Sequence, residues 1–350
     1  VLCISFLFQQ SSFAQVAAVE LNLGAHLARM SNNLVQENFR PIHLRYLSFD
    51  ALNNNIKVLL DKGNAKKLEA PQVETSTKEL LKYFLIGVSL PNETFWVNLR
   101  PDSQDKIIED TLAQTDVGKI MLEADLQLKK DTALFTSPHT PEGKLYWDKL
   151  YKKAASLYGN ENVTIPTITR PWILPNEVIV RETSQSAYIY KATLKVMLEQ
   201  DYLKDSTFYN FSDERAKILN ECSSDLIREL IIPKLVKEVN TAKRYGALRQ
   251  VFYSLVFARW FKTKFNGTSG TYGSLIDSKN LTNLTSSENW SKTTYFKQYQ
   301  KSFAEGEYNI KEPVYTPSGQ MIRSYFSGGV VALPNVIQNE GKFSVSSSAI

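Results

Sequence analysis

The strongest candidate for acid–base chemistry in this sequence is His139 with Glu142, three residues further along the chain. Thr140 followed by Pro141 predicts a helix start at this point. The positive end of a helix favours the neutral form of a nearby imidazole, which a carboxylate can orient. Proton transfer also needs a nucleophile or a substrate within hydrogen-bond reach, and no sequence pattern supplies one. We therefore favour a capping and turn role over a catalytic one.

Metal and cofactor sites find little support. The other histidines, His26 and His43, belong to no HExxH motif and form no pair at helical spacing, and the two cysteines lack zinc-site spacing. No EF-hand loop is present, although calcium sites built from carboxylates alone stay open. Cys222 lies four residues from both Ile218 and Leu226, on the apolar stripe of a predicted helix, which favours a small buried hydrophobe over a nucleophile. We expect no metal and no cofactor.

Templates for nucleophilic and phosphate chemistry also fail. The glycine-rich stretch 267–274 lacks the Gly-Lys-Ser/Thr of a phosphate loop and follows a helix where a strand is required. Ser269 is not a nucleophile elbow because Thr271 occupies the position that needs glycine. Paired carboxylates for glycoside hydrolysis stay open, since only their separation in space identifies them. The first to test are Asp102, Asp116, Glu123 and Asp125.

The charge balance argues against a nucleic-acid partner. The chain of 350 residues carries 41 Lys and Arg against 36 Asp and Glu, a net charge of +5, and the basic residues are spread along it. A nucleic-acid binder concentrates them in one patch. The closest approach is 249–264, where Arg249, Arg259, Lys262 and Lys264 alternate with aromatic residues. We favour a core helix with a basic solvated edge, and the alternative is a nucleic-acid or membrane surface.

The first fourteen residues resemble an export signal. Residues 1–8 are uncharged and almost wholly apolar, and Ser12 and Ala14 form a small-x-small cleavage site. Cleavage there would remove Cys3, leaving Cys222 alone and no internal disulfide. The alternative is an ordinary buried strand. Elsewhere no apolar stretch reaches eighteen residues, so we expect no transmembrane helix. Seven Asn-x-Ser/Thr triplets suggest surface turns that carry no glycan in a bacterial protein; they begin at Asn92, Asn162, Asn210, Asn266, Asn280, Asn283 and Asn289.

Helical spacing and caps predict helices over 16–37, about 116–132 and 140–159. Leu145, Tyr146, Leu150 and Ala154 lie on the core side of the third, and Gly159 can close it. A further helix is predicted to open with a capping box at Ser76 and Glu79 and to stop before Pro91. From 213 to 265 the 3.6-residue period returns, with a kink or break expected at Pro233.

Strands are predicted at 93–102, 163–168, 177–181 and 187–198, and again around a turn at 317–319. In 187–198 the even positions from Tyr188 to Leu198 are apolar and alternate with Lys191, Thr193 and Lys195, so the strand has one wet face. The short connections between 163 and 198 predict a hairpin or meander.

The predicted fold is α+β, with an antiparallel sheet from the middle and end of the chain packed against the long helices of 213–265. The predicted parts are a signal-like segment 1–14, a mainly helical part 15–160, and a part 161–333 of strands and long helices that shares its core. Residues 334–350 form a tail or linker.

Several blocks resemble an uncharacterised family of exported bacterial proteins, over roughly 93–330. The blocks are ETFWVNLRPD (93–102), TDVGKIMLEADLQLKKD (115–131), TPEGKLYWDKLYKKA (140–154), AYIYKATLKVMLEQDYL (187–203), ELIIPKLVKEVN (229–240) and SYFSGG (324–329). The resemblance implies an extracytoplasmic setting in the bacterial envelope and carries no activity, ligand or site residue.

We therefore expect an exported, non-catalytic protein that binds a protein or envelope partner or contributes to an envelope assembly. Export, the aromatic content of 17 Tyr, 18 Phe and 5 Trp, and the failure of the catalytic templates motivate this hypothesis. The alternative is a hydrolase of cell-wall glycan or peptide that uses carboxylates. A third option is a membrane-surface protein that uses the basic aromatic helix.

Overall fold

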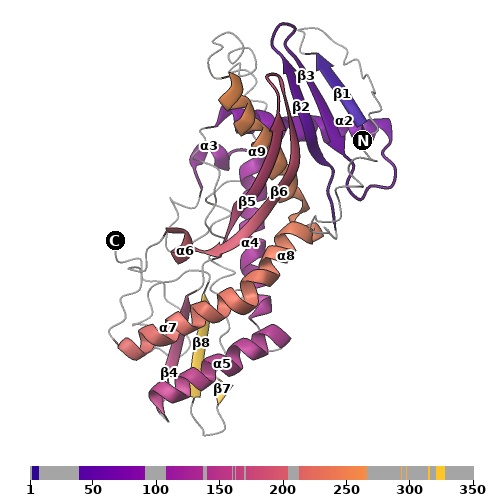
Figure 1. Cartoon of the computed structure of the whole chain (residues 1–350). Helices are drawn as coiled ribbons and strands as arrows, with labels where there is room; N and C mark the ends of the chain where they lie inside the picture. The colour runs from indigo at the N-terminus through magenta and orange to yellow at the C-terminus, as the bar shows by residue number, and fades with distance from the viewer. Residues whose placement is uncertain are drawn as a thin grey trace.

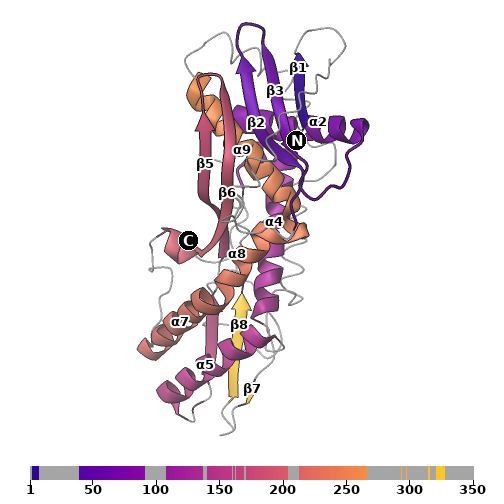
Figure 2. The same ribbon diagram turned by 45° about the vertical axis from the view of Figure 1, so that its right-hand side comes forward.

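The computed structural model confirms an α+β protein in which an antiparallel sheet lies against long helices (Figure 1). The body is elongated, with the larger sheet at one end and a smaller sheet at the other (Figure 2). The described residues are 2–7, 39–90, 108–136, 140–159, 161, 163–168, 171–203, 213–265, 293, 297, 314–315 and 321–327.

The larger sheet has the strand order β1–β3–β2–β6–β5, and every neighbouring pair is antiparallel. Its strands are β1 (Leu2–Leu7), β2 (His43–Asp50), β3 (Asn55–Asp61), β5 (Pro171–Glu182) and β6 (Ser186–Leu198). β2 and β3 form one hairpin and β5 and β6 form another, as the period-two pattern predicted for the second. The hairpins meet where 46–48 pair with 186–188. The sheet thus combines early and middle segments, which corrects its expected origin in the middle and end of the chain.

β1 lies at the edge of the larger sheet, where Leu2 is opposite Leu60 and Leu7 is opposite Asn55 of β3. This pairing corresponds to the alternative interpretation of the first residues as a strand. It is a property of the uncut chain, whereas an export signal is removed after transport. The export signal therefore stays a prediction.

Long helices cover one face of the larger sheet. α9 (Gly246–Phe265) packs against β2 and β6, and α2 (Ala70–Ser89) packs against α9. The two helices approach closely at Gly87, where a Cβ atom would lie 2.7 Å from the Cβ of Ala258. α8 (Ile232–Thr241) contacts β6, and α4 (Asp116–Phe135) contacts β5. Buried apolar side chains from these elements form one continuous core.

The smaller sheet has the order β4–β8–β7 and contacts α7 (Glu214–Leu226), which in turn packs against α5 (Pro141–Tyr158). Its strands are β4 (Val163–Ile168), β7 (Val314–Tyr315) and β8 (Met321–Ser327). β7 and β8 are antiparallel, which confirms the predicted strands around 317–319. β4 is parallel to β8, so the expectation that it joins the middle hairpin or meander is wrong. The long stretch of chain between β4 and β8 supplies the crossover that a parallel pair requires.

Helix starts agree with the sequence at some positions and differ at others. α4 starts at Asp116, and α5 (Pro141–Tyr158) starts after Thr140, whose hydroxyl accepts a bond from the Gly143 amide. Gly159 closes α5 with φ of 61°, as predicted. Tyr146, Leu150 and Ala154 are buried as expected, but Leu145 is 44% exposed.

The capping box predicted at Ser76 and Glu79 is wrong, because α2 begins six residues earlier. Glu69 and Gln72 form the reciprocal capping box there, and Pro71 lies in the first turn. Glu79 is inside the helix and accepts a hydrogen bond of 2.6 Å from the Tyr83 hydroxyl. Proline in a first turn marks a helix start as strongly as a capping pair does.

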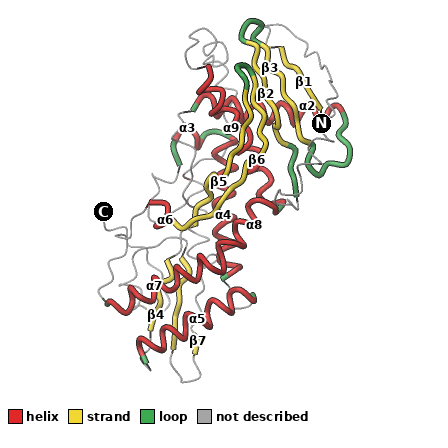
Figure 3. The backbone as a smooth tube through the Cα atoms, in the orientation of Figure 1, coloured by secondary structure: helices red, strands yellow, loops and turns green. Residues whose placement is uncertain are grey.

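The long helical segment changes its hydrogen-bonding pattern just before Pro233, where a kink or break was predicted. α7 (Glu214–Leu226) passes into a π-helical turn at Ile227–Ile231, and α8 begins at Ile232 with proline in its first turn. Figure 3 shows the whole segment as helix. The proline ring cannot donate a backbone bond and crowds the preceding turn. The wider turn accommodates this, and the buried Ile227 and Ile231 stay in the core.

The buried face of β6 changes phase at Tyr190. Ala187 and Ile189 are buried before this point, and Ala192, Leu194, Val196 and Leu198 after it. Opposite β5, Ile179 pairs with Lys191 and Val180 pairs with Ile189, so Tyr190 is the extra residue of a bulge. The predicted core positions of Tyr188 and Tyr190 are therefore wrong, while the alternation beyond Ala192 is confirmed.

The following predicted features lie outside the described residues: the helix 16–37, the strand 93–102, His26, Asp102, His139, the stretch 267–274 with Ser269, the asparagines of the seven Asn-x-Ser/Thr triplets and the segment 334–350. The triplet that begins at Asn162 continues into β4, so a strand follows there.

Candidate functional site: an apolar cavity between the sheet and α9

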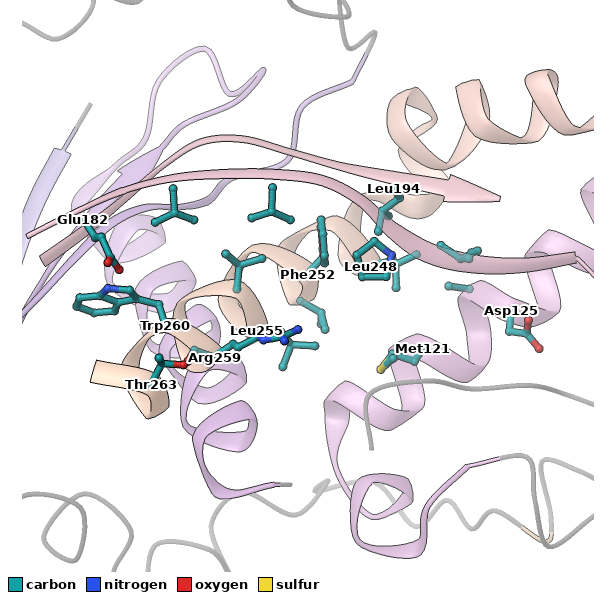
Figure 4. Close-up of a pocket in the computed structure, with 17 residues that line it drawn as sticks. Met121, Asp125, Glu182, Leu194, Leu248, Phe252, Leu255, Arg259, Trp260 and Thr263 are labelled. Atoms are coloured by element: carbon teal, nitrogen blue, oxygen red, sulfur yellow. The ribbon is translucent and has the colours of Figure 1, made fainter. Parts of the chain in front are cut away.

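A cavity of about 460 Å³ lies between the β5–β6 hairpin and α9, with α4 at one end (Figure 4). This volume is in the range of small-molecule binding sites. Most of its lining side chains are aliphatic or aromatic. Of the described residues that line it, none is a histidine, a cysteine or a serine. The cavity is therefore suited to bind an apolar body.

Regular side-chain periods create the walls of the cavity. On β5, Val178 and Val180 point to the cavity because alternate residues of a strand share a face. On α9, Leu248, Phe252 and Leu255 are spaced by three or four residues, which places them on one side of the helix. The residues on β5 repeat every two positions and those on α9 every three or four. The cavity therefore forms where this face of the strand lies opposite this face of the helix.

One end of the cavity holds Trp260 and Glu182, and the side chain of Arg259, the residue before Trp260 on α9, extends along the cavity toward Leu255 (Figure 4). Arg259 is exposed, and no described carboxylate pairs with it. Trp260 is 7% exposed, and its indole Nε1 has no hydrogen-bond partner among the described residues. Glu182 is paired with Lys264 at 3.0 Å. This part of the cavity thus offers hydrogen-bond donors near a carboxylate that is already neutralised.

The opposite end holds Met121 and Asp125 of α4 (Figure 4). Asp125 accepts a bond of 2.7 Å from Lys129, one helical turn later, and both side chains are at most 5% exposed. Lys129 neutralises this buried carboxylate. The end of the cavity that Met121 lines therefore contains one neutralised ion pair, Asp125–Lys129, next to apolar side chains.

A separate buried group surrounds His43 on β2. Its Nδ1 lies 2.9 Å from the Pro41 carbonyl, and its ring packs against Tyr253 with centroids 4.1 Å apart. Its Nε2 is 4.0 Å from Asp61, whose carboxylate accepts a bond of 2.5 Å from Arg40. Burial outweighs the attraction of Asp61 and lowers the pKa of His43 to about 4. His43 is 2% exposed, so it packs in the core and has no open path to a substrate.

Asp131 is a buried carboxylate with three hydrogen-bond donors around it. It accepts bonds from the Tyr245 hydroxyl at 2.7 Å, from Arg244 Nε at 2.9 Å and from Gln127 Nε2 at 2.9 Å. Burial and the negative charge of Asp131 raise the pKa of Tyr245 far above its ordinary value. These contacts fasten α4 to the turn before α9, which is a structural role.

The residues predicted to do chemistry are not brought together. Glu142 pairs with Lys234 of α8 at 2.9 Å, which lowers the pKa of its carboxyl group, while its predicted partner His139 is outside the described residues. Asp116 pairs with Lys82 at 2.5 Å, and Asp125 is nine residues further along the same helix. Glu123 is exposed. These described carboxylates do not form the facing pair that glycoside hydrolysis needs.

Cys222 packs partly buried against the core from α7, and burial raises the pKa of its thiol. A raised pKa disfavours the thiolate, which is the reactive form. Within the described residues no three histidine, cysteine, aspartate or glutamate side chains lie close enough to hold a metal ion. No helix in the described ranges is long and apolar enough to cross a membrane.

The basic solvated edge expected on α9 is confirmed for Arg259 and Lys264, which are exposed, and is wrong for Arg249. Arg249 is only 3% exposed and donates to the carbonyl groups of Val239 and Phe39 at 2.8 Å. Lys262 donates to the Leu90 carbonyl at 2.6 Å. A buried arginine of this kind joins chain segments, which corrects the interpretation of Arg249 as a surface residue.

The chain matches no family model, no curated protein and no solved structure.

Sequence reasoning selected two of the cavity residues, Asp125 as a candidate carboxylate and Arg259 in the basic aromatic helix, but did not predict the cavity. The stretch FYSLVFARWF is apolar nearly all round, which indicates burial on several sides. It gives no sign that one of these sides faces an open space, because a filled interface and a cavity have the same apolar pattern. An arginine inside such a stretch, Arg259, is a local signal that points to a ligand.

Proposed function

We propose that this chain is an exported, non-catalytic binding protein whose cavity between β5–β6 and α9 takes a small apolar ligand. The observation that supports this function is the cavity itself, about 460 Å³ with aliphatic and aromatic walls. An empty apolar space costs stability, since its lining atoms lose contacts. A bound ligand restores these contacts and stabilises the folded chain by mass action.

The chemistry around the cavity favours binding over turnover. Asp125 is held by Lys129 and Glu182 by Lys264, so the two carboxylates that line it are already paired. They belong to opposite ends of the cavity (Figure 4). The proposal therefore assigns them no proton transfer.

The test is a titration with a neutral naphthylamine dye whose fluorescence rises in apolar surroundings. We expect wild-type protein to bind the dye in a saturable way. Val256→Trp fills the cavity from α9 and should weaken binding by at least tenfold. Leu52→Trp introduces the same side chain at a position that is 95% exposed, and should leave dye binding unchanged. Absence of dye binding in the wild type, as expected if another segment fills the cavity, would overturn the proposal.

The proposed compartment is extracytoplasmic. The apolar start of the chain, the cleavage-like site at Ala14 and the resemblance to exported bacterial proteins support it. Mass spectrometry of the protein from its natural source tests this part. A new N-terminus at Gln15 is the expected result, and an intact first segment on protein from the cytosol would contradict it.

A further inference from the structure

We infer that the ligand of this cavity is an amphipathic molecule with one anionic end group, held from α9 by the guanidinium of Arg259 and helped by the neighbouring Trp260. This inference rests on the proposed binding function and names its ligand class. The shared chemistry is a single alkyl chain that ends in a carboxylate or a phosphate.

Two side chains that line the cavity from α9, Arg259 and Trp260, donate hydrogen bonds and do not accept them. A guanidinium has five N–H donors and an indole has one, and neither has an acceptor. The acceptors nearby are already engaged in part, because Glu182 pairs with Lys264 and the Thr263 hydroxyl donates to the Arg259 carbonyl. The indole Nε1 of Trp260 is buried without a hydrogen-bond partner among the described residues. A buried donor without a partner costs free energy unless a ligand or water satisfies it, and a ligand group with acceptor oxygens does so.

The local charge favours an anion. Glu182 is compensated by Lys264 at 3.0 Å, which leaves the charge of Arg259 in excess in the cavity. Lys262 is close enough that the positive charge of Arg259 contributes, after burial, to lowering its pKa to about 8. A guanidinium binds carboxylate and phosphate groups through paired hydrogen bonds. An ammonium end group would meet repulsion at the same position.

The rest of the cavity fixes the orientation of the ligand. Arg259 continues the same side of α9 as Leu248, Phe252 and Leu255, so an alkyl chain anchored at the arginine runs along this apolar stripe (Figure 4). At its far end the Asp125–Lys129 pair is closed and offers no free charge of either sign. The anionic group of the ligand therefore binds at Arg259, and its alkyl chain extends from there toward the Asp125 end of the cavity.

Isothermal titration calorimetry with four probes of equal chain length tests the inference: dodecanoate, dodecyl phosphate, dodecanol and dodecylammonium, each below its micelle concentration. We expect the two anions to bind wild-type protein about tenfold more tightly than dodecanol. Dodecylammonium should bind most weakly. The two anionic probes distinguish a carboxylate ligand from a phosphate ligand by their ratio.

Variants assign the effect to the named groups. Arg259→Gln should lower affinity for the anions by about tenfold and leave dodecanol unchanged, and Trp260→Phe should lower anion affinity by about fivefold. The matched control is Arg181→Gln on β5. Arg181 carries the same charge next to Glu182, but it belongs to the opposite face of the strand from Val180 and Glu182 and does not line the cavity. It should leave all four affinities unchanged.

The outcomes separate the inference from the function on which it rests. Equal binding of anions and alcohol, unchanged in Arg259→Gln, overturns the anionic ligand and keeps the apolar cavity as a binding site. A preference for the ammonium also overturns it, because Glu182 would then be the recognition group. Binding of no probe overturns the binding function together with the inference. An equal loss in Arg181→Gln and Arg259→Gln refutes the assigned position.

Discussion

His43 shows how burial changes the chemistry of a single residue. Its side chain is 2% exposed and its pKa is lowered to about 4 from an ordinary 6.5. Between these values the unfolded chain binds a proton that the folded chain does not, so the free energy of unfolding must fall as pH decreases. The integrated loss is about 3 kcal/mol.

We predict that this decrease is present in the wild type and absent in His43→Gln. Urea unfolding followed by circular dichroism at several pH values between 6.5 and 4 measures it. Asp61 does not produce the same effect, because the pKa of its carboxyl is lowered and its loss of charge begins at lower pH. Parallel stability curves for the two proteins would show that His43 does not titrate in this way.

The side chain of Asn240 hydrogen-bonds the backbone of Leu194 in β6. Its amide accepts from the Leu194 N–H at 3.0 Å and donates to the Leu194 carbonyl at 2.8 Å. β2 pairs with β6 only at 186–188 among the described residues, so the Asn240 side chain takes the place of a neighbouring strand at Leu194. Leu194 also lines the cavity.

We predict that Asn240→Leu lowers the free energy of unfolding by about 2 to 4 kcal/mol, because it leaves two buried backbone groups unsatisfied. Chemical denaturation measures the loss. Asn176→Leu is the matched control, since Asn176 is exposed and makes only a long bond of 3.4 Å to Thr193. A loss of equal size in the control would contradict the assigned role.

At the scale of elements, the contact between α2 and α9 depends on Gly87. A Cβ atom there would lie 2.7 Å from both Ala258 Cβ and Leu255 Cδ2. Alanine is favoured over glycine within a helix by about 1 kcal/mol, but overpacking a buried contact costs about 1 to 3 kcal/mol.

We predict that Gly87→Ala is destabilising by about 1 kcal/mol and weakens dye binding, because Leu255 must shift and it lines the cavity. Thermal unfolding and the dye titration measure the two effects. Adding Ala258→Gly should recover dye binding by returning the space. A Gly87→Ala protein that is more stable and binds the dye unchanged would contradict this prediction. It would show that α2 and α9 can move apart enough to accommodate the added methyl group.

The element types could be predicted from local signals, and their partners could not. The start of α5 after Thr140 and its end at Gly159 follow from caps, and the change of helical pattern before Pro233 follows from a missing donor. The predicted alternation of β6 is wrong before Ala192, because a bulge at Tyr190 depends on the partner strand. The predicted partner of β4 is wrong for a similar reason, since its actual partner β8 is more than 150 residues away in the chain.

At the scale of the whole molecule, the role of β1 decides the edge of the larger sheet. The apolar residues Ile56, Val58 and Leu60 of β3 are at most 1% exposed and belong to the common core. Without β1, strand β3 loses the backbone bonds on its outer side, each worth about 1 kcal/mol net.

We predict that a chain starting at Gln15 unfolds in one cooperative transition and keeps its dye affinity, as a processed exported protein must. Calorimetry and the dye titration measure these properties, with the full chain as the control. An insoluble product, or a loss of cooperativity, would show that β1 is an integral strand and contradict its assignment to a cleaved signal.

The sequence by itself determined the class of the fold, most of the helices and the β5–β6 hairpin, because caps, prolines and hydrophobic period act within a few residues. It also indicated that α9 is enclosed on several sides. Only the tertiary structure decided that 46–48 pair with 186–188 and that Arg249 is buried. It also decided that Arg259, Trp260 and Glu182 line the same cavity. These contacts join segments far apart in the chain, and their geometry depends on how whole faces pack rather than on any local pattern.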